Sequence, residues 1–274
     1  MRLIGYLVDG VPTIGAVQQD LVAPLASVEE FYADVDAVLA RASRASGSVR
    51  LDEVSQVPPV PRSAKVLCVG LNYQGHAAEA RMTVPPYPTV FARWASTLVV
   101  DGDVLSVPPS EPGLDWEVEL AAVIGRRTSL ADRGTALASV LGYTVFNDVS
   151  AREHQMHTTQ WTLGKNADRT GPIGPVVVTP DEIGDLQTLH LQTRVNGEVM
   201  QSACTKDMIF SVSDIIAYIT ETITLEPGDV VATGTPEGVA LARTPQQYLT
   251  GGDVVEVEID RIGTLRNPVG AHDR

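Results

Sequence analysis

The stretch DWEVEL at positions 115 to 120 alternates acidic and apolar residues without interruption. A period of two predicts a β-strand, which places Asp115, Glu117 and Glu119 on one face with neighbouring side chains about 6.6 Å apart. Two of these carboxylates could bind one cation. Considered alone, the run is more typical of a solvent-exposed face whose apolar alternates point inward.

Another acidic residue, Asp148, closely follows an apolar segment (residues 142 to 146) that predicts a second strand. The chain there turns into a predicted helix from 150 to 156, so capping that helix is an alternative role for Asp148. With Glu117 and Glu119 it would complete a set of three carboxylates. Such a set suits Mg²⁺, with room for waters and a chelating substrate, and no Cys and His cluster in the sequence offers a zinc site instead.

Three polar residues could bind an anionic substrate beside these carboxylates. Arg152 and Gln155 lie three positions apart on the predicted helix and therefore share a face. A surface salt bridge is the other interpretation of this pair. Lys165 follows Gly164, which allows close backbone approach, although a single lysine is ordinarily only a solvated charge.

His76 and Glu79 lie three positions apart in a helix predicted from 76 to 80. One helical turn would let the carboxylate orient the imidazole and raise its basicity, as a general base requires. A polar helix face with a chance pairing is the commoner origin of such spacing. The proline-rich segment from 82 to 88 is typical of a mobile loop that could close over a site.

The first sixty residues predict a small α+β domain. Strands from 2 to 8 and from 11 to 17 flank an Asp-Gly turn, and a serine at position 27 caps a helix that runs to about residue 42. The proline-rich residues 57 to 63 read as a linker. We therefore expect domains at 1 to 60 and 61 to 274.

The second domain has short β-like segments between turn signals, and its helices are few. The fold class is thus α+β and mainly β. The expected strands cover residues 65 to 69, 89 to 91, 118 to 124, 142 to 146, 176 to 179, 189 to 195, 230 to 233 and 254 to 259. The expected helices cover residues 76 to 80, 131 to 140, 150 to 156 and 213 to 221, and an Asn-Gly pair at 196 and 197 predicts a hairpin.

Composition excludes several classes of protein. The 274 residues carry a net charge of −14, which disfavours nucleic acid, and a 44% hydrophobic share is ample for a core. No run reaches the roughly 18 apolar residues of a membrane span, and the N-terminus lacks a signal-peptide core. We therefore expect no membrane partner and a cytoplasmic location. Cys68 and Cys204 lack zinc or disulfide spacing and predict buried, inert thiols.

Taken together, these residues resemble the fumarylacetoacetate hydrolase family, in particular its smaller bacterial members, from about residue 65 to residue 269. Five ordered motifs carry the resemblance, and although each is weak alone, the ordered set is specific. They are Gly70-Leu71-Asn72-Tyr73 with His76 and Glu79; Trp116-Glu117-Val118-Glu119-Leu120; Asn147-Asp148-Val149-Ser150-Ala151-Arg152 with Gln155; Gly164-Lys165 with Pro172-Ile173-Gly174-Pro175; and Thr233-Gly234-Thr235-Pro236-Glu237-Gly238.

The resemblance implies a catalytic domain of the mixed β-roll or β-sandwich type, a homodimer and a Mg²⁺ or Mn²⁺ ion. It also implies roles for nine residues. Metal ligands would be Glu117, Glu119 and Asp148; His76 and Glu79 would activate water, with Lys165 a third catalytic residue; and Arg152, Gln155 and Thr235 would bind the substrate.

Two departures from the family pattern bear on the substrate. Residues 166 to 170 are small or polar where many relatives carry aromatic residues, so the usual pocket wall is missing from this run. Arg93 stands where many relatives carry a lysine, and its planar fork differs from a point charge.

The expected function is metal-dependent hydrolysis of a carbon–carbon bond in a small 1,3-dicarbonyl or 2-oxo acid. Because the same enolate chemistry supports other outcomes, isomerisation, tautomerisation or decarboxylation of a related acid stays open. A non-catalytic, metal-dependent metabolite-binding protein is the alternative from another class.

Overall fold

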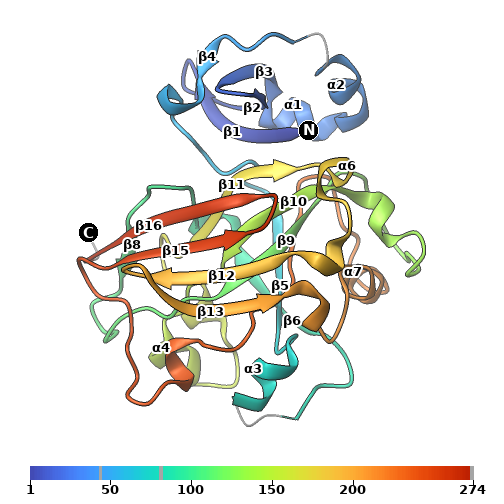
Figure 1. Ribbon diagram of the computed structural model, residues 1–274. Coiled ribbons are helices and arrows are strands. Elements are labelled where there is room, and N and C mark those ends of the chain that lie inside the picture. Colours follow the sequence, from blue (N-terminus) through green and yellow to red (C-terminus); the bar gives the residue numbers. More distant parts are fainter. Residues whose placement is uncertain (43–44, 80–82, 272–274) are drawn as a thin grey trace.

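The computed structural model describes residues 1 to 42, 45 to 79 and 83 to 271, and over these residues the strands form two sheets (Figure 1). The larger sheet has the order β4-β3-β2-β1-β11-β10-β9-β14-β5-β6, with β7 pairing to β11. Its strands are β4 (Val49–Arg50), β3 (Leu21–Ser27), β2 (Val11–Gln18), β1 (Arg2–Val8), β11 (Gly171–Val178), β10 (Val140–Asn147), β9 (Val118–Ile124), β14 (Val230–Ala232), β5 (Lys65–Gly70), β6 (Thr89–Trp94) and β7 (Leu98–Val99).

The smaller sheet has the order β13-β12-β15-β16-β8 and lies across β9 and β10. Its strands are β13 (Glu198–Cys204), β12 (His190–Val195), β15 (Val254–Ile259), β16 (Gly263–Ala271) and β8 (Leu105–Val107). The hairpin predicted between β12 and β13 is confirmed, because Asn196 and Gly197 both adopt positive φ angles, 51° and 86°. The α+β, mainly β prediction is likewise confirmed.

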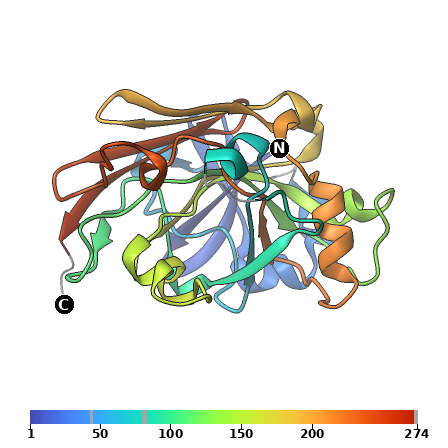
Figure 2. The same ribbon diagram turned by 90° about the horizontal axis from the view of Figure 1, so that it is seen from below.

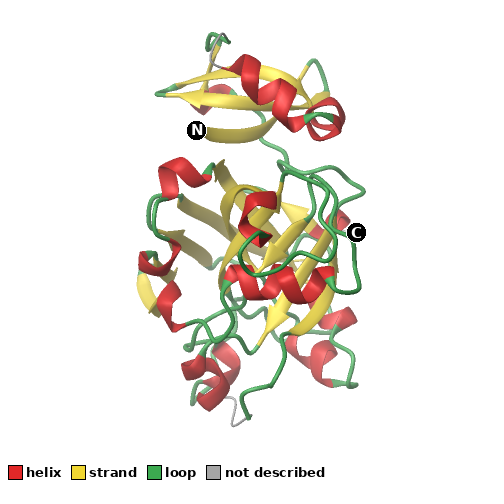
Figure 3. Ribbon diagram, turned by 90° about the vertical axis from the view of Figure 1, so that its right-hand side faces the viewer, coloured by secondary structure: helices red, strands yellow, loops and turns green. Residues whose placement is uncertain are grey.

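Short helices are distributed around the sheets, as the red ribbons of Figure 3 show. The α-helices are α1 (Val28–Ala33), α2 (Val35–Ala42), α3 (Gln74–Glu79), α4 (Arg152–Met156), α5 (Thr162–Lys165), α6 (Pro180–Ile183) and α7 (Val212–Thr220). Short 3₁₀ helices are η1 (Leu51–Glu53), η2 (Ala95–Thr97), η3 (Ala136–Ser139), η4 (Leu186–Thr188), η5 (Thr205–Asp207) and η6 (Ala240–Ala242). Within the described ranges, no helix is long and apolar enough to cross a membrane.

The N-terminal unit contains the two strands and the turn that its sequence predicts, together with β3 and β4, which the sequence does not predict. Asp9 and Gly10 adopt φ angles of 50° and 80° between β1 and β2, and Ser27 forms a capping box with Glu30 at the start of α1. The single helix expected to residue 42 is instead two helices, because Asp34 leaves helical geometry at φ −154° and its carboxylate caps α2.

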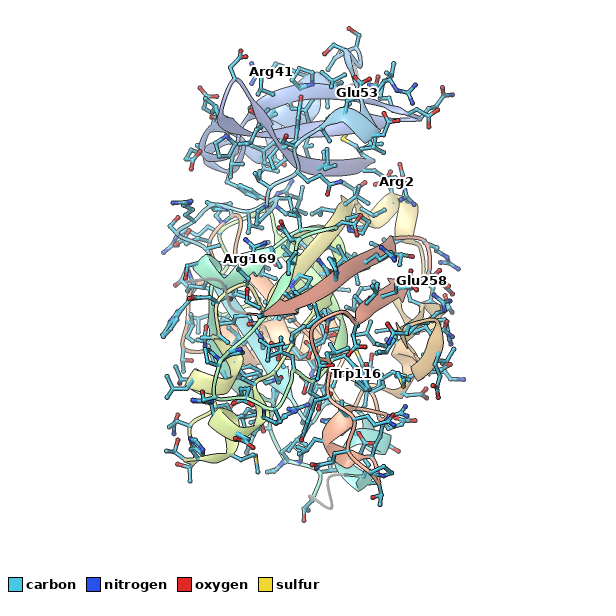
Figure 4. The ribbon with its side chains drawn as sticks, turned by 90° about the vertical axis from the view of Figure 1, so that its left-hand side faces the viewer. Arg2, Arg41, Glu53, Trp116, Arg169 and Glu258 are labelled. Atoms are coloured by element: carbon cyan, nitrogen blue, oxygen red, sulfur yellow. The ribbon has the colours of Figure 1, made fainter. Side chains whose placement is uncertain are left out.

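The N-terminal unit is joined to the rest of the chain through its first strand. Arg2 and Leu3 of β1 pair antiparallel with β11, so one sheet runs through both parts. The guanidinium of Arg2 also donates to the carbonyls of Arg261 and Ile262 at 2.6 and 3.0 Å, at the junction seen in Figure 4. Folding of residues 1 to 60 as a separate domain stays a prediction.

The strand β9 lies at the centre of the core, and all seven of its residues are buried. Leu120 and Ala122 join an apolar cluster that includes the smaller sheet, whereas Ala121 and Val123 join a second cluster on the opposite face. The solvent-exposed face that residues 115 to 120 suggest when considered alone is therefore wrong: Asp115, Glu117 and Glu119 are at most 4% exposed.

Two helix predictions need correction. Residues 131 to 140 do not form one helix: Asp132 accepts main-chain N–H groups of Gly134 and Thr135 in a turn, η3 follows, and Val140 already belongs to β10. The helix expected from 150 begins at Arg152, because Ser150 pairs with Asp115 as a β-bridge. Cys68 is buried as expected, whereas Cys204 is only half-buried.

Candidate active site

The predicted site residues gather at the end of the body opposite the N-terminal unit, where α3 and α4 lie in Figure 1 and which faces the viewer in Figure 2. Strands β9 and β10 are antiparallel neighbours, and Glu119 pairs with Phe146. The start of β9 therefore meets the end of β10. This register brings Glu117 and Glu119 beside Asp148, and one oxygen of each lies within 4.8 Å of the others.

Buried cations surround this carboxylate cluster. The Lys165 Nζ atom donates to an oxygen of Glu117 and to one of Asp148, both at 2.6 Å. Arg152 donates to the other oxygen of Glu117 at 2.5 Å. Lys165 and Arg152 are 2% and 6% exposed, so these are buried ion pairs and not solvated surface charges.

The three carboxylates differ in their electrostatic balance. Burial raises the pKa of Glu117, but the charges of Lys165 and Arg152 outweigh burial and hold that pKa below its usual value. Burial, reinforced by the charges of Asp148 and Glu117, raises the pKa of Glu119 well above its usual value. Glu119 accepts only the N–H of Gly234, at 2.8 Å, among the described residues. The ionised carboxylate of Glu119 therefore has too little positive charge near it to offset its burial.

This donor set fits a divalent cation. Hard cations such as Mg²⁺ and Mn²⁺ bind carboxylate oxygens, and three buried carboxylates converge here. The convergence of the three carboxylates supports the fit, and so does the side chain of Glu119, which accepts a single hydrogen bond among the described residues and would be stabilised by added positive charge. Glu117, Glu119 and Asp148 are the residues that could hold the ion.

Asp148 does not cap a helix, which corrects the alternative interpretation of this residue. The N-cap position of α4 is Ala151, and no side chain caps it. Arg93 of β6 instead donates to the Oδ1 atom of Asp148 through Nε at 2.8 Å and lies 2.7 Å away through its second terminal nitrogen. The same guanidinium donates to the Val149 carbonyl at 2.7 Å and to Thr170 at 3.0 Å. Both Asp148 and Arg93 are completely buried.

Asp115 belongs to the scaffold and not to the carboxylate cluster. Its side chain accepts the main-chain N–H groups of Ala240 and Leu241 at 2.7 and 3.0 Å, and it accepts a bond from Arg152 at 2.8 Å. It thereby holds the loop at η6 against the helix that carries Arg152.

The His76–Glu79 pair forms as the spacing predicts. The Nδ1 atom of His76 lies 2.8 Å from one oxygen of Glu79, and the other oxygen accepts the N–H of Gly238 at 2.9 Å. An ionised carboxylate can only accept, so Nδ1 carries the proton and Nε2 is left as the basic nitrogen.

The predicted substrate-binding residues lie in the same place. Gln155 accepts a bond from Arg152 at 2.7 Å, which together with Asp115 and Glu117 engages every nitrogen of that guanidinium. The hydroxyl of Thr235 accepts from Gln201 at 2.8 Å and so keeps its own proton free to donate.

A cavity of about 350 Å³ opens onto these groups. Asp148 lies behind its wall, and the other eight predicted site residues line it: His76, Glu79, Glu117, Glu119, Arg152, Gln155, Lys165 and Thr235. The predicted mobile loop begins at residue 82, which lies outside the described residues. Of the part that is described, Tyr87 stacks on Tyr218 of α7 with ring centroids 5.8 Å apart.

Fold and cavity define a class of β-rich enzyme with a buried carboxylate centre and a His–Glu dyad in one pocket. Comparison with known sequences identifies the family. The model of the fumarylacetoacetate (FAA) hydrolase C-terminal domain matches residues 65 to 270, so the chain belongs to the fumarylacetoacetate hydrolase family, as its motifs predict.

Individual relatives carry different activities in their names. The mitochondrial oxaloacetate tautomerase of Bos taurus is 44% identical over 219 residues, covering 79% of this chain and 70% of the relative. The 2,4-didehydro-3-deoxy-L-rhamnonate hydrolase of Sphingomonas sp. (strain SKA58) is 44% identical over 213 residues, covering 77% and 75%. The solved fumarylacetoacetate hydrolase of Exiguobacterium antarcticum matches with a TM-score of 0.82 at 34% identity, covering 99% and 100%.

Proposed function

We propose that this protein hydrolyses a carbon–carbon bond in a small 1,3-dicarbonyl 2-oxo acid and requires Mg²⁺ or Mn²⁺. One observation carries the proposal: a His–Glu dyad lines the same cavity as Glu117 and Glu119, two of the three clustered carboxylates. A cation site alone would be sufficient to bind the acid or to support proton transfer within it. Hydrolysis also needs a base that can activate water, and His76 provides one.

The side chains would divide the work as follows. Glu117, Glu119 and Asp148 would hold the cation, which supplies Lewis-acid polarisation of a substrate carbonyl. Thr235 would donate its free hydroxyl proton to the substrate carboxylate, and Lys165 would place positive charge beside the reacting oxygens.

The hydrolytic step follows from the orientation of the dyad. The Nε2 atom of His76 takes a proton from water, whose oxygen bonds to the carbonyl carbon distal to the substrate carboxylate. The bond between the attacked carbonyl carbon and the methylene carbon that separates the two carbonyl groups then breaks. Its electron pair passes to the 2-oxo acid fragment as an enolate, and the proton held by His76 is returned to that carbon. One water and one dicarbonyl acid thus give two carboxylic acids.

The direct test is turnover of 2,4-dioxo acids in the presence and absence of Mg²⁺ and Mn²⁺. We expect stoichiometric release of pyruvate and a second carboxylic acid, abolished by EDTA and restored by either ion. Undiminished turnover in EDTA would show that the reaction does not require a cation. Loss of substrate without release of pyruvate would show that the reaction is not this hydrolysis.

Tautomerisation is the second candidate, favoured by the 44% identity to a relative named as an oxaloacetate tautomerase. The same pocket would catalyse it if no water is positioned, because the enol is then simply protonated at carbon. Assaying oxaloacetate beside the 2,4-dioxo acids separates the two, since a tautomerase changes the enol absorbance without releasing a second acid. Decarboxylation would be seen as released carbon dioxide.

A metal-dependent binding protein is the non-catalytic alternative, and the intact dyad argues against it. Unchanged substrate after hours of tight binding would favour this alternative. The homodimer and the cytoplasmic location stay predictions.

A further inference from the structure

Two aromatic side chains form one wall of the active-site cavity. Phe91 of β6 and Trp161, which directly precedes α5, meet edge to face with ring centroids 5.4 Å apart and an interplanar angle of 76°. The Nζ atom of Lys165 lies 5.3 Å from the Phe91 ring centroid. The aromatic wall therefore begins beside the carboxylate centre and leads away from it.

The position of Trp161 depends on a distant glycine. A Cβ atom at Gly70 would lie 2.6 and 2.9 Å from two atoms of the indole ring, so only glycine lets the ring lie against the end of β5. The Trp161 carbonyl also accepts the N–H of Lys165 at 3.0 Å, which ties the backbone of Trp161 to that of a centre residue. The wall is thus built into the fold.

The other side chains that line the cavity are mostly apolar. They include Val69, Leu71, Met156, Val239, Leu241 and Ala242. Among the described lining residues, both permanent cations, Arg152 and Lys165, are already paired with buried carboxylates. A second substrate carboxylate placed here would be buried without a partner, which is strongly unfavourable.

We infer that the substrate is a monocarboxylic 2-oxo acid whose distal carbonyl bears a bulky apolar group, an aryl or branched alkyl chain, and that Phe91 and Trp161 bind this group. The inference rests on the proposed function and adds the substrate class. It also distinguishes this chain from a tautomerase acting on a small diacid, because oxaloacetate would leave the aromatic wall uncovered and place a charge against it. The apolar wall that residues 166 to 170 lack is supplied from two other segments.

The test compares kcat/KM for 2,4-dioxo acids whose terminal group is methyl, isobutyl, phenyl or carboxyvinyl, with Mg²⁺ present. We expect phenyl and isobutyl to exceed methyl by at least tenfold and the carboxyvinyl diacid to be the poorest, since each added apolar group contributes about tenfold or more in such pockets. The variant Trp161→Ala should lower the phenyl-to-methyl ratio about tenfold or more, and Trp161→Phe should restore most of it.

The matched control is Trp94→Ala, because Trp94 is on the same strand as Phe91 but is 54% exposed and does not line the cavity. It should keep the wild-type ratio. A preference for the diacid or for methyl would overturn the inference, and so would an equal loss for all substrates in Trp161→Ala, which indicates a structural role only.

Binding of phenylpyruvate, pyruvate and oxaloacetate, measured by calorimetry, tests the apolar subsite independently of hydrolysis. If no 2,4-dioxo acid is turned over, hydrolysis fails. Tighter binding of phenylpyruvate, weakened in Trp161→Ala, would still support the apolar subsite, and tighter binding of oxaloacetate would overturn it.

Discussion

The Nδ1 atom of His76 lies 2.8 Å from Glu79 Oε1, in a cavity that Glu117 and Glu119 of the carboxylate cluster also line. This contact orients the imidazole, so its loss should affect the chemical step more than substrate binding. For His76→Ala we expect kcat to fall by about 10² to 10⁴ with little change in KM, the usual range for a general base. Steady-state kinetics at saturating Mg²⁺ measure both constants.

Glu79→Gln provides the matched variant for the dyad. The amide has a single carbonyl oxygen, so it keeps the bond from Nδ1 or the bond from Gly238 but not both, because these bonds go to different oxygens of Glu79. It also cannot stabilise the imidazolium, yet His76 is retained, so a smaller loss of kcat is expected than in His76→Ala. Turnover within about tenfold of wild type in His76→Ala would contradict the role of a general base.

Removal of one carboxylate of the cluster should abolish stabilisation by the cation. We expect wild-type protein to gain about 2.7 kcal/mol in unfolding free energy at a Mg²⁺ concentration of 100 times Kd, and Glu119→Gln to gain almost nothing. Thermal denaturation with Mg²⁺ and with EDTA measures the difference. Glu198→Gln, an exposed position on β13, is the control that should respond like wild type.

We also expect Glu119→Gln to change how the stability of the protein depends on pH when EDTA is present. Burial and the neighbouring carboxylates raise the pKa of Glu119 in the folded state, so folding without a cation favours the protonated form. That contribution to stability is fully present below the ordinary value of 4.5 and is lost as pH rises through the raised pKa. Denaturant titrations should therefore show that the free energy of unfolding of Glu119→Gln increases relative to that of wild type as the pH increases from about 4.5. A constant difference across pH would contradict this.

The buried pair of Arg93 and Asp148 positions one face of the cluster, and breaking it should be costly. Arg93→Met leaves the carboxylate without its guanidinium, and the loss of a buried partner typically costs about 3 to 5 kcal/mol; the remaining bond from Lys165 places this case near the lower end. Arg93→Lys keeps the positive charge and should therefore lower the free energy of unfolding by less. It should also lower the affinity for Mn²⁺, because lysine holds Asp148 less firmly. Urea denaturation and calorimetry measure the two effects.

The control for the Arg93 variants is Arg126→Met, which breaks the exposed pair with Asp36. Surface pairs contribute about 0 to 1 kcal/mol, so little change is expected there. Equal destabilisation by both methionine variants would mean that the buried pair has no special importance.

The local parts of the fold and site were predictable from sequence because their causes are local. The Asp9-Gly10 turn, the Ser27 capping box and the His76–Glu79 spacing each depend on residues within a few positions. The strand ends that carry Glu117 and Asp148 could likewise be placed, but their burial could not. The strands that cover β9 are β12 and β15, which come from residues 190 to 259, and a period of two does not reveal which face they cover.

Contacts between residues far apart in the chain could not be predicted from the sequence. Arg93 reaches Asp148 across 55 positions, and because β9, β14 and β5 lie between β10 and β6 in the sheet order, strand pairing alone does not reveal the bond either. Trp161 stands in a polar run with no periodic signal, and Gly70, which makes room for it, is identifiable only as part of a motif. The strands β7 and β8 have two and three residues, too few to show any alternation.

Gly164 was expected to allow close backbone approach, and it does so against Gln155 of α4. A Cβ atom at position 164 would lie 2.5 Å from both the Cα and the backbone nitrogen of Gln155, so no side-chain rotation relieves the clash. Gly164→Ala should therefore destabilise the protein by about 1 to 3 kcal/mol. It should also move Lys165 relative to Gln155, and a shift of about 1 Å can cost 10²-fold in turnover. Gly251→Ala, where nothing lies within 4 Å of the added atom, should leave stability and turnover almost unchanged. If Gly164→Ala matched this control in both measurements, the close contact between α4 and α5 would not be what positions Lys165.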